Sequence, residues 1–311
     1  MLTKPYILCL MGPTAAGKTP LAVQLVQRLP CDIISVDSAM VYRGLDIGTA
    51  KPGPDILQVA PHRLIDIRDP AEAYSAGEFQ RDVLQEIAAI HAQGRIPLLV
   101  GGTMLYFRVL QQGLAQMPVA DPLLRIELQQ EAEKIGWEGL HARLASVDPE
   151  AAKRIHPHDS QRIQRALEVY LQAGQPLTTY WQQSATQLST LCPIYYLAIA
   201  PAERRVLHKR IEDRFDRMLA LGFVEEVQRL FERGDLSIEQ PAIRCVGYRQ
   251  MWEYFLGEVD YTTMRDKAIA ATRQLAKRQL TWLRSWPNVV WFDGEAPDLL
   301  DKVLYFCSAP S

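Results

Sequence analysis

The sequence predicts an α/β protein in which a parallel sheet is flanked by helices and interrupted by an all-helical insertion. Over the first third of the chain, apolar runs of strand length alternate with segments that are apolar at helical spacing. This alternation is typical of a parallel sheet covered on both faces. From about residue 116 to residue 191 the pattern is helical throughout. We therefore expect a core formed by residues 1–115 and 192–311, and a helical insertion domain formed by residues 116–191.

The first strand and helix enclose the clearest motif. Tyr6–Met11 is apolar and of buried-strand length, and Leu21–Leu29 is apolar at helical spacing. Between them every fixed position of the phosphate-binding pattern G-x-x-x-x-G-K-S/T is matched. The loop consists of Gly12, Pro13, Thr14, Ala15, Ala16, Gly17, Lys18 and Thr19. Its backbone N–H groups and the following helix start favour an anion, so a P-loop NTPase-like core is predicted, with Lys18 as a cation and Thr19 as an Mg²⁺ ligand.

The remaining elements follow from periodicity and from helix start signals. Further strands are expected at Asp32–Val36, His62–Ile67, Ile96–Val100, Ile194–Ala200 and Val289–Phe292. Helices of the core are expected at 79–92, from residue 104, and at about 202–221, 225–233, 248–256, 262–286 and 299–306. Within the insertion, Asp121-Pro122 and Asp148-Pro149 indicate helix starts, and Gly136 and Gly174 lie near helix ends.

Composition indicates an ordinary globular protein. The 311 residues are 48% hydrophobic and 23% charged, with a net charge of −2, so any basic surface must be local. The five cysteines form no C-x-x-C pair, which disfavours a disulfide framework or a zinc site. No run approaches the length of a membrane span, and the first strand begins too early to leave room for a signal peptide. A cytoplasmic protein is expected.

Polar residues follow the ends of two further strands. Asp37 and Ser38 come after the second strand, and Gly101–Thr103 follows the fourth. Because ligands of parallel sheets bind at the carboxyl ends of strands, both segments are expected beside the phosphate loop. Asp37 could accept a proton from an incoming nucleophile or hold Mg²⁺ through water. The alternative is an aspartate that only stabilises a turn.

Three groups of cations follow. Arg210, Arg214 and Arg217 recur at helical spacing, which leaves open whether they cover the phosphate loop or form a solvated surface. Two arginines flank an aromatic residue in Arg244–Arg249, and Arg273–Arg284 holds four cations and no acid. Basic residues interleaved with Gln, Thr and Trp suit phosphate contacts and base stacking. The other interpretation of the last segment is an amphipathic helix whose core is formed by Leu275, Leu280 and Leu283. Both interpretations hold if one face of the helix is buried and the other is basic.

Five segments together resemble the bacterial tRNA dimethylallyltransferases, also called tRNA isopentenyltransferases. They are the phosphate loop, Asp37-Ser38, Asp46–Pro52, Gly101–Tyr106 and Arg244–Arg249, and they occur in the same order as in the family. The resemblance implies transfer of a dimethylallyl group from dimethylallyl diphosphate to N6 of the adenosine 3′ of the tRNA anticodon, with release of diphosphate. It implies that the phosphate loop is a diphosphate cradle, and that the enzyme is a monomer that binds Mg²⁺.

The resemblance also implies roles for single residues. Lys18 and Thr19 match the family's diphosphate and Mg²⁺ contacts, and Asp37 matches its general base. Arg214, within the segment His208–Phe215, matches a second clamp on the diphosphate. The helical insertion would grip the anticodon stem-loop.

Matches to the family's tRNA contacts are spread over both parts of the chain. They are Asp37, Ser38, Ala39, Met40, Thr103, Arg125, Gln161, Arg162, Ile163, Gln164, Arg165, Arg244, Cys245, Val246, Gly247, Tyr248, Arg249, Lys277, Arg278, Gln279, Leu280, Thr281, Trp282, Leu283 and Arg284. The sequence departs from the family's pattern at Ala16, where many members have Ser, and at Pro20, where Ala is usual. Neither change removes a functional side chain.

Two other functions compete with this one. A small-molecule kinase would hold ATP in the phosphate loop, but it would leave the helical insertion and the basic segments without a role. A non-enzymatic RNA-binding switch would need no base at Asp37. Dependence of the reaction on RNA and on a prenyl donor distinguishes all three.

Overall fold

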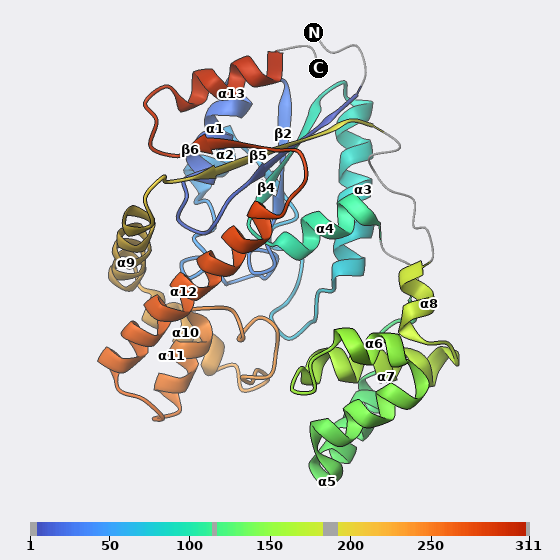
Figure 1. The fold of residues 1–311 in the computed structure, drawn as a ribbon. Coiled ribbons are helices and arrows are strands. Elements are labelled where there is room, and N and C mark those ends of the chain that lie inside the picture. Colours follow the sequence, from blue (N-terminus) through green and yellow to red (C-terminus); the bar gives the residue numbers. More distant parts are fainter. Residues whose placement is uncertain (1–4, 114–116, 183–191, 309–311) are drawn as a thin grey trace. The chain divides into compact units, whose positions relative to one another are not determined.

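The computed structural model describes residues 5–113, 117–182 and 192–308 (Figure 1). The chain divides into two compact units, residues 1–111 with 189–311, and residues 112–188. The expected boundaries at Gln116 and Leu191 lie close to this division and outside the described residues. Within the described ranges, none of the helices combines the length and apolar character that crossing a bilayer requires.

The first unit is built on one parallel sheet, to which the described residues contribute six strands in the order β3-β2-β4-β1-β5-β6. The strands are β1 Ile7–Met11, β2 Cys31–Val36, β3 His62–Arg63, β4 Ile96–Gly101, β5 Ile194–Ala200 and β6 Val289–Asp293. At the carboxyl edge, Gly101 of β4 lies in register with both Met11 of β1 and Val36 of β2. The three strand ends predicted to carry chemistry are therefore neighbours, and the predicted fold class is confirmed.

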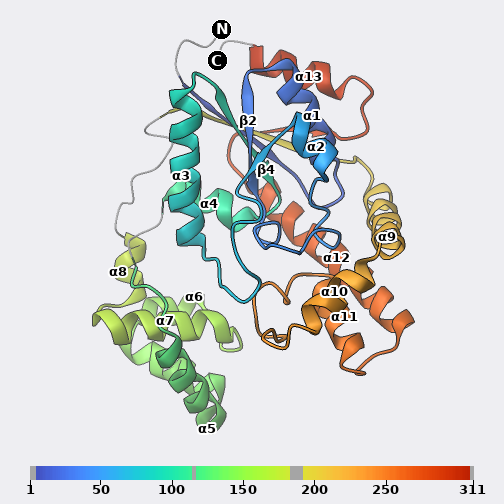
Figure 2. The same ribbon diagram turned by 180° about the vertical axis from the view of Figure 1, so that it is seen from behind.

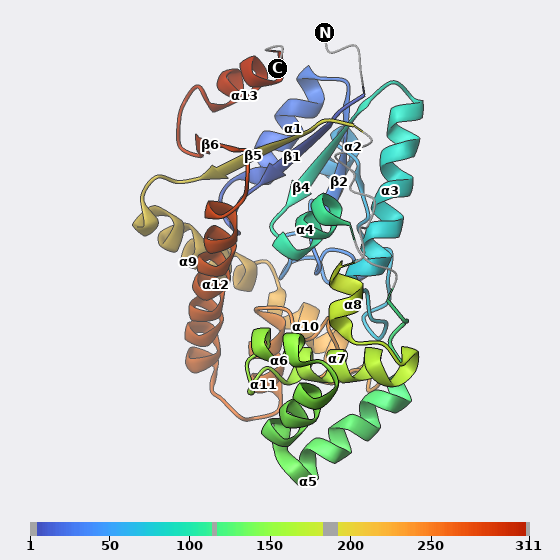
Figure 3. The same cartoon turned by 45° about the vertical axis from the view of Figure 1, so that its right-hand side comes forward.

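Alternate residues of the strands pack against helices on opposite faces. Leu8 and Leu10 of β1 form one core cluster with Leu21 and Leu25 of α1 (Lys18–Arg28) and with α13 (Leu299–Ser308). Figure 2 shows this side, with α1 and α2 (Pro54–Val59) in front of the strands. Figure 3 shows α3 (Ala76–Ala92) and α4 (Met104–Gln112), which pack together through the stacked rings of Phe79 and Tyr106.

Four helices form a lobe next to the carboxyl ends of the strands (Figure 1). They are α9 (Arg204–Ala220), α10 (Phe223–Phe231), α11 (Tyr248–Phe255) and α12 (Tyr261–Arg284). The long helix α12 runs from this lobe to the sheet (Figure 3). Its carboxyl end can therefore contribute side chains to the phosphate loop.

The second unit is helical in its described part, as predicted. It contains α5 (Pro122–Val147), α6 (Pro149–Arg154), α7 (Ser160–Ala173) and α8 (Leu177–Gln182). The Asp121 side chain caps α5 and the Asp148 side chain caps α6, as the Asp-Pro pairs predict. Gly136 has a φ of 76°, which breaks α5 into two segments.

The prediction of a third strand over His62–Ile67 was too long. Only His62 and Arg63 pair with β2. Leu64 and Asp66 have φ angles of 61° and 56°, which are incompatible with an extended strand. The chain turns here instead, because the backbone N–H of Asp66 donates to the carbonyl of Met40. The short helix α2 was not predicted, since its six residues carry no apolar period.

Candidate phosphate-binding and catalytic site

The phosphate loop has the backbone that its sequence requires. Ala15 and Gly17 have positive φ angles of 62° and 94°, and α1 begins at Lys18. A loop of this shape directs successive N–H groups to one side, next to the positive end of the helix. Gly12 is needed for close approach, because a Cβ at this position would lie 2.5 Å from the carbonyl oxygen of Ile199.

The ammonium group of Lys18 lies over its own loop. Its Nζ donates to the carbonyl oxygens of Gly12 at 2.9 Å and Pro13 at 2.7 Å. Burial, together with the positive charge of Arg214, lowers the pKa of Lys18 to about 8, while the charge of Asp37 acts in the opposite direction. A bound anion would raise the pKa of Lys18 again, so the electrostatics of this site favour a negatively charged ligand.

Gln279 of α12 ties the phosphate loop to the end of β4. Its side-chain oxygen accepts from the backbone N–H of Thr14 at 2.9 Å, and its amide donates to the carbonyl of Gly102 at 2.8 Å. A Cβ on Gly102 would lie 2.5 Å from Nε2 of Gln279, so a side chain here would displace that amide. The family resemblance implied that Gln279 is a tRNA contact, but the structure buries its side chain against the phosphate loop, with 9% exposure.

Asp37 forms a turn at the end of β2. Its Oδ1 accepts from the backbone N–H groups of Ala39 at 2.8 Å and Met40 at 3.3 Å. The charge of Asp37 also acts on Lys18 and Arg214 across the strand ends. The turn and the proposed catalytic role are therefore compatible, because the turn uses one carboxylate oxygen.

Arg214 differs from the two arginines at helical spacing around it. Its guanidinium donates to the carbonyl of Thr49 at 3.3 Å, and burial lowers its pKa, opposed by Asp37. Arg210 instead faces Glu295 at 3.3 Å, and Arg217 is exposed. Helical spacing left open whether these three arginines cover the phosphate loop or form a solvated surface. The structure answers this in part, because Arg214 faces the site and Arg210 and Arg217 do not.

The residues around the loop are compatible with Mg²⁺ bound together with phosphate. The described ranges contain no cluster of three or more His, Cys, Asp or Glu side chains that could hold a metal ion by themselves. Mg²⁺ commonly takes few protein ligands and completes its shell with water and phosphate oxygens. Thr19, on the first turn of α1, is the hydroxyl that such an ion would use.

The predicted tRNA contacts of the first unit fall into surface and interior residues. Thr103 lies beside the Asp37 turn, where its hydroxyl accepts from the backbone N–H of Ser38 at 3.1 Å. Exposed members are Ser38, Arg244, Arg249, Lys277, Arg278, Thr281 and Arg284, and partly buried members are Ala39, Met40, Thr103, Cys245, Val246, Leu280 and Trp282. The side chains of Tyr248 and Leu283 are fully buried, so the structure corrects the prediction that these side chains contact tRNA.

The exposed face of α12 carries an open hollow of about 330 Å³. It is lined by Gln274, Lys277, Arg278, Thr281 and Trp282. The guanidinium of Arg108 lies 5.5 Å from the centre of the Trp282 ring. The helix therefore has the two faces that the sequence left as alternatives, because Ala276, Gln279 and Leu283 are buried on the other side.

Two of the predicted tRNA contacts in the second unit bind a buried acid. Glu168, with no exposed surface, accepts from Arg125 at 2.9 and 3.1 Å and from Arg165 at 2.6 Å. Gln164 donates to the carbonyl of Arg125, and Ile163 is fully buried in the helical core. Gln161 and Arg162 are exposed. Ile163 is thus a core residue and not a surface contact, as the period of α7 puts it on the apolar face.

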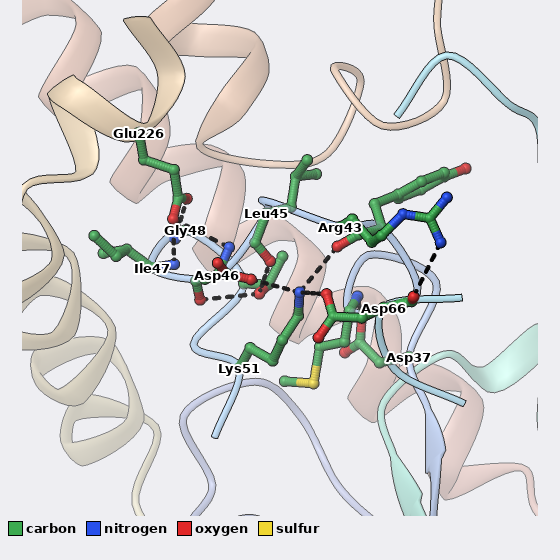
Figure 4. A network of polar contacts seen from close by, with 12 residues as sticks. Asp37, Arg43, Leu45, Asp46, Ile47, Gly48, Lys51, Asp66 and Glu226 are labelled. Atoms are coloured by element: carbon green, nitrogen blue, oxygen red, sulfur yellow. Dashed lines mark hydrogen bonds and ion pairs between the residues drawn. The ribbon is translucent and has the colours of Figure 1, made fainter. Parts of the chain in front are cut away.

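A polar network beside the site was not predicted (Figure 4). Lys51, with 4% side-chain exposure, binds the carbonyl of Tyr42 at 2.9 Å and the carboxylates of Asp46 and Asp66 at 2.5 Å. The buried carboxylate of Glu226 binds the backbone of Asp46–Gly48. The motif Asp46–Pro52 was the available signal, but a single Glu in an amphipathic helix gives no indication of its partner.

Comparison with known proteins identifies the family of the chain. The family described as IPP transferase matches residues 40–286. A tRNA dimethylallyltransferase of Thioalkalivibrio sulfidiphilus is 60% identical over 295 residues, covering 94% of this chain and 92% of the relative. One from Coxiella burnetii (strain Dugway 5J108-111) is 58% identical, covering 98% and 97%. The crystal structure of a tRNA isopentenylpyrophosphate transferase from Bacillus halodurans is 36% identical, covers 98% of this chain and 96% of that one, and has a TM-score of 0.71.

Proposed function

This chain belongs to the IPP transferase family, and from that premise we propose that it transfers a dimethylallyl group from dimethylallyl diphosphate to N6 of the adenosine 3′ of a tRNA anticodon. The chain is an enzyme that prenylates tRNA. The identity of the donor, the target atom and the roles of single residues are the parts that we add to this.

The proposed reaction exchanges one bond to the allylic carbon. The carbon–oxygen bond to the diphosphate breaks, and a bond from that carbon to N6 of adenine forms. The proton lost by N6 goes to the carboxylate of Asp37, since an exocyclic amine is a poor nucleophile until its proton is removed. The electron pair of the broken bond stays on the departing diphosphate.

The charge that develops on the diphosphate requires cations and N–H groups already in position. The observation that carries the proposal is the convergence of Lys18 after β1, Asp37 after β2 and Arg214 of α9, whose charges act on one another. Lys18, Arg214 and the loop N–H groups would stabilise the leaving group. Thr19 would hold an Mg²⁺ that neutralises further diphosphate charge.

The acceptor base must leave its stack to reach this site. The exposed cations of α12 and of Arg244–Arg249 supply phosphate contacts, and Trp282 offers a ring for base stacking. We also propose that one chain is sufficient, because the three proposed catalytic side chains come from the same unit. Light scattering of the purified protein tests the expected monomer.

The first experiment compares prenyl donor and nucleotide. The protein is incubated with Mg²⁺ and unmodified tRNA whose anticodon is followed by adenosine, with either dimethylallyl diphosphate or ATP. Nuclease digestion and mass spectrometry then locate any modified nucleoside. We expect the mass of one dimethylallyl group on that adenosine with the prenyl donor alone. Turnover of ATP without any such gain would show that the proposed function is wrong.

A further inference from the structure

Glu226 of α10 is a buried carboxylate whose acceptor positions are all used. It is 2% exposed. Its Oε2 accepts from the backbone N–H groups of Asp46 at 3.1 Å and Ile47 at 2.7 Å, and its Oε1 accepts from that of Gly48 at 3.1 Å (Figure 4). Oε1 also accepts from the hydroxyl of Tyr248. Buried carboxylates are costly unless several donors satisfy them, so this one specifies the shape of the loop Asp46–Thr49.

The loop Asp46–Thr49 packs closely against two aromatic rings, those of Phe223 and Tyr248. A Cβ on Gly48 would lie 2.2 Å from Cε2 of Phe223 and 2.6 Å from Cε2 of Tyr248. The rings of Phe223 and Tyr248 meet edge to face, 5.1 Å apart. Tyr248 also belongs to the predicted tRNA-binding segment Arg244–Arg249, and burial beside Glu226 raises the pKa of its hydroxyl, which remains a donor.

The next residue of the same loop contacts the proposed clamp of the leaving group. The carbonyl oxygen of Thr49 accepts from Nη2 of Arg214 at 3.3 Å. Phe215, adjacent to Arg214 in α9, contacts Phe223 edge to face at 6.0 Å. The backbone of Asp46–Thr49 is therefore held by Glu226 at one end and holds the guanidinium of Arg214 at the other.

We propose that Glu226 is a positioning residue for the prenyl transfer: by fastening the backbone of Asp46–Gly48, it places the Thr49 carbonyl and thereby orients Arg214 toward the departing diphosphate. This inference rests on the proposed function of the site. It predicts that Glu226 acts through Arg214 and has little effect on the reaction when Arg214 is absent.

A double-mutant cycle tests this dependence. Glu226→Gln keeps the side-chain shape but replaces one acceptor oxygen by a donor, which faces N–H or O–H groups that are donors too. We expect kcat at saturating substrates to fall about tenfold, since small misplacement of a group that acts in the transition state has effects of this size. Arg214→Ala should lower kcat about 100-fold, the loss typical of a removed charge-stabilising donor.

The double variant should be no slower than Arg214→Ala within about twofold, because the effects of residues that act through one another are not additive. Glu225→Gln, an exposed neighbour on α10, is the matched control and should leave kcat and the melting temperature unchanged. A second readout is the affinity for inorganic diphosphate with Mg²⁺ by calorimetry, which Glu226→Gln should weaken and Glu225→Gln should not.

Fully additive effects in the cycle, or a diphosphate affinity that Glu226→Gln leaves unaltered, would overturn the positioning role. The proposed function would still stand in that case if the wild-type protein prenylates tRNA. Absence of prenylation by the wild-type protein would be a failure of the proposed function itself. If Glu226→Gln does not fold, Tyr248→Phe removes one partner of the same carboxylate and carries the cycle with Arg214→Ala. Additive effects of Tyr248→Phe and Arg214→Ala would likewise overturn the positioning role of Glu226.

Discussion

At the scale of single residues, the site depends on side chains that combine a structural contact with a proposed chemical role. Asp37 closes a turn with Oδ1 and faces the charges of Lys18 and Arg214. Lys18 binds the carbonyls of its own loop and would exchange these contacts for phosphate oxygens. To test the chemical role of such a residue, a substitution must keep its structural contact and remove only the chemical group.

Asp37→Asn separates turn formation from proton transfer. The amide keeps an oxygen that can accept from Ala39 and Met40, but it cannot take the proton of N6. We expect single-turnover transfer to slow by about 10²- to 10⁴-fold, the usual contribution of a general base. The affinity for tRNA should stay near that of the wild type, and Asp37→Ala, which also loses the turn, should be no faster. Near-normal transfer by Asp37→Asn would leave Asp37 with the turn alone.

The lowered pKa of Lys18 predicts a pH dependence of donor binding. The charged form exists below a pKa of about 8 and is lost as the pH rises through it. The affinity for dimethylallyl diphosphate without tRNA should therefore fall between pH 7 and pH 9.5, a range in which the diphosphate ester remains ionised. Calorimetric titration measures this. Lys18→Met should bind more weakly and lose the step, and an identical step in Lys18→Met would assign the titration to another group.

At the scale of elements, α12 performs two tasks with opposite faces. Its buried side places Gln279 between the Thr14 N–H and the Gly102 carbonyl. Its exposed side presents Lys277 and Arg278 around the hollow that Trp282 lines. One helix thus joins the phosphate loop to the basic surface proposed to bind RNA. A separate prediction follows for each face.

On the inner face, Gln279→Leu should disturb the phosphate loop. The N–H of Thr14 and the carbonyl of Gly102 would lose their partner in a buried place, at a cost of about 1–3 kcal/mol each. We expect lower melting temperature and weaker diphosphate binding, with tRNA affinity less affected. Gln274→Leu, on the exposed side of the same helix, is the matched control for the melting temperature and for diphosphate binding. Unchanged diphosphate binding in Gln279→Leu would mean that the loop keeps its shape without this contact.

On the outer face, Arg278→Ala should weaken tRNA binding and reduce its salt dependence. Removal of one phosphate contact lowers the slope of log affinity against log salt by about 1. Filter binding or fluorescence anisotropy from low to moderate salt measures that slope. Arg229→Ala, an exposed arginine of α10, serves as control. An unaltered slope in Arg278→Ala would make this face an ordinary solvated surface.

At the scale of the whole molecule, each unit has its own core, and the core of the second unit includes the buried carboxylate of Glu168. Glu168 joins Arg125, Arg165 and the backbone N–H of Asp121. Burial acts to raise the pKa of Glu168, but the hydrogen bonds from Arg125 and Arg165 outweigh it, so the pKa is lowered. The arginines of this cluster stabilise the fold of the insertion whatever else they contact.

The stability of the helical unit should therefore depend on Glu168 and on pH. Because the pKa of Glu168 is lowered in the folded state, its carboxylate stabilises the folded protein at pH values above the unfolded pKa of 4.5. This stabilisation is lost as the pH falls through the folded-state pKa. Glu168→Gln should reduce the free energy of unfolding by about 2 kcal/mol at pH 7, since two partly exposed arginines lose their anion. The difference from wild type should shrink at low pH. Denaturant unfolding measures both, and a constant difference would contradict the ion-pair explanation.

The sequence alone determined the local features of this protein. The period of apolar residues predicted nearly every long element, and the Asp-Pro and glycine signals predicted their ends, because these depend on contacts within a few residues. The glycines of the loop Gly12–Thr19 indicate the backbone conformation that the loop needs. The motifs and their order along the chain identified the family. The prediction of a strand over His62–Ile67 was too long, because residues with left-handed backbone angles end the strand after Arg63 although the composition favours its continuation.

Only the tertiary structure decided which side chains meet. Gln279 reaches Thr14 across 265 positions of the chain and Glu226 reaches Asp46 across 180, and no local pattern encodes such a pair. The same is true of the contact between Arg214 and the Thr49 carbonyl, and of the burial of Tyr248 among aromatic rings. Long-range packing sets these contacts, since a residue type permits a hydrogen bond but only the folded chain supplies its partner.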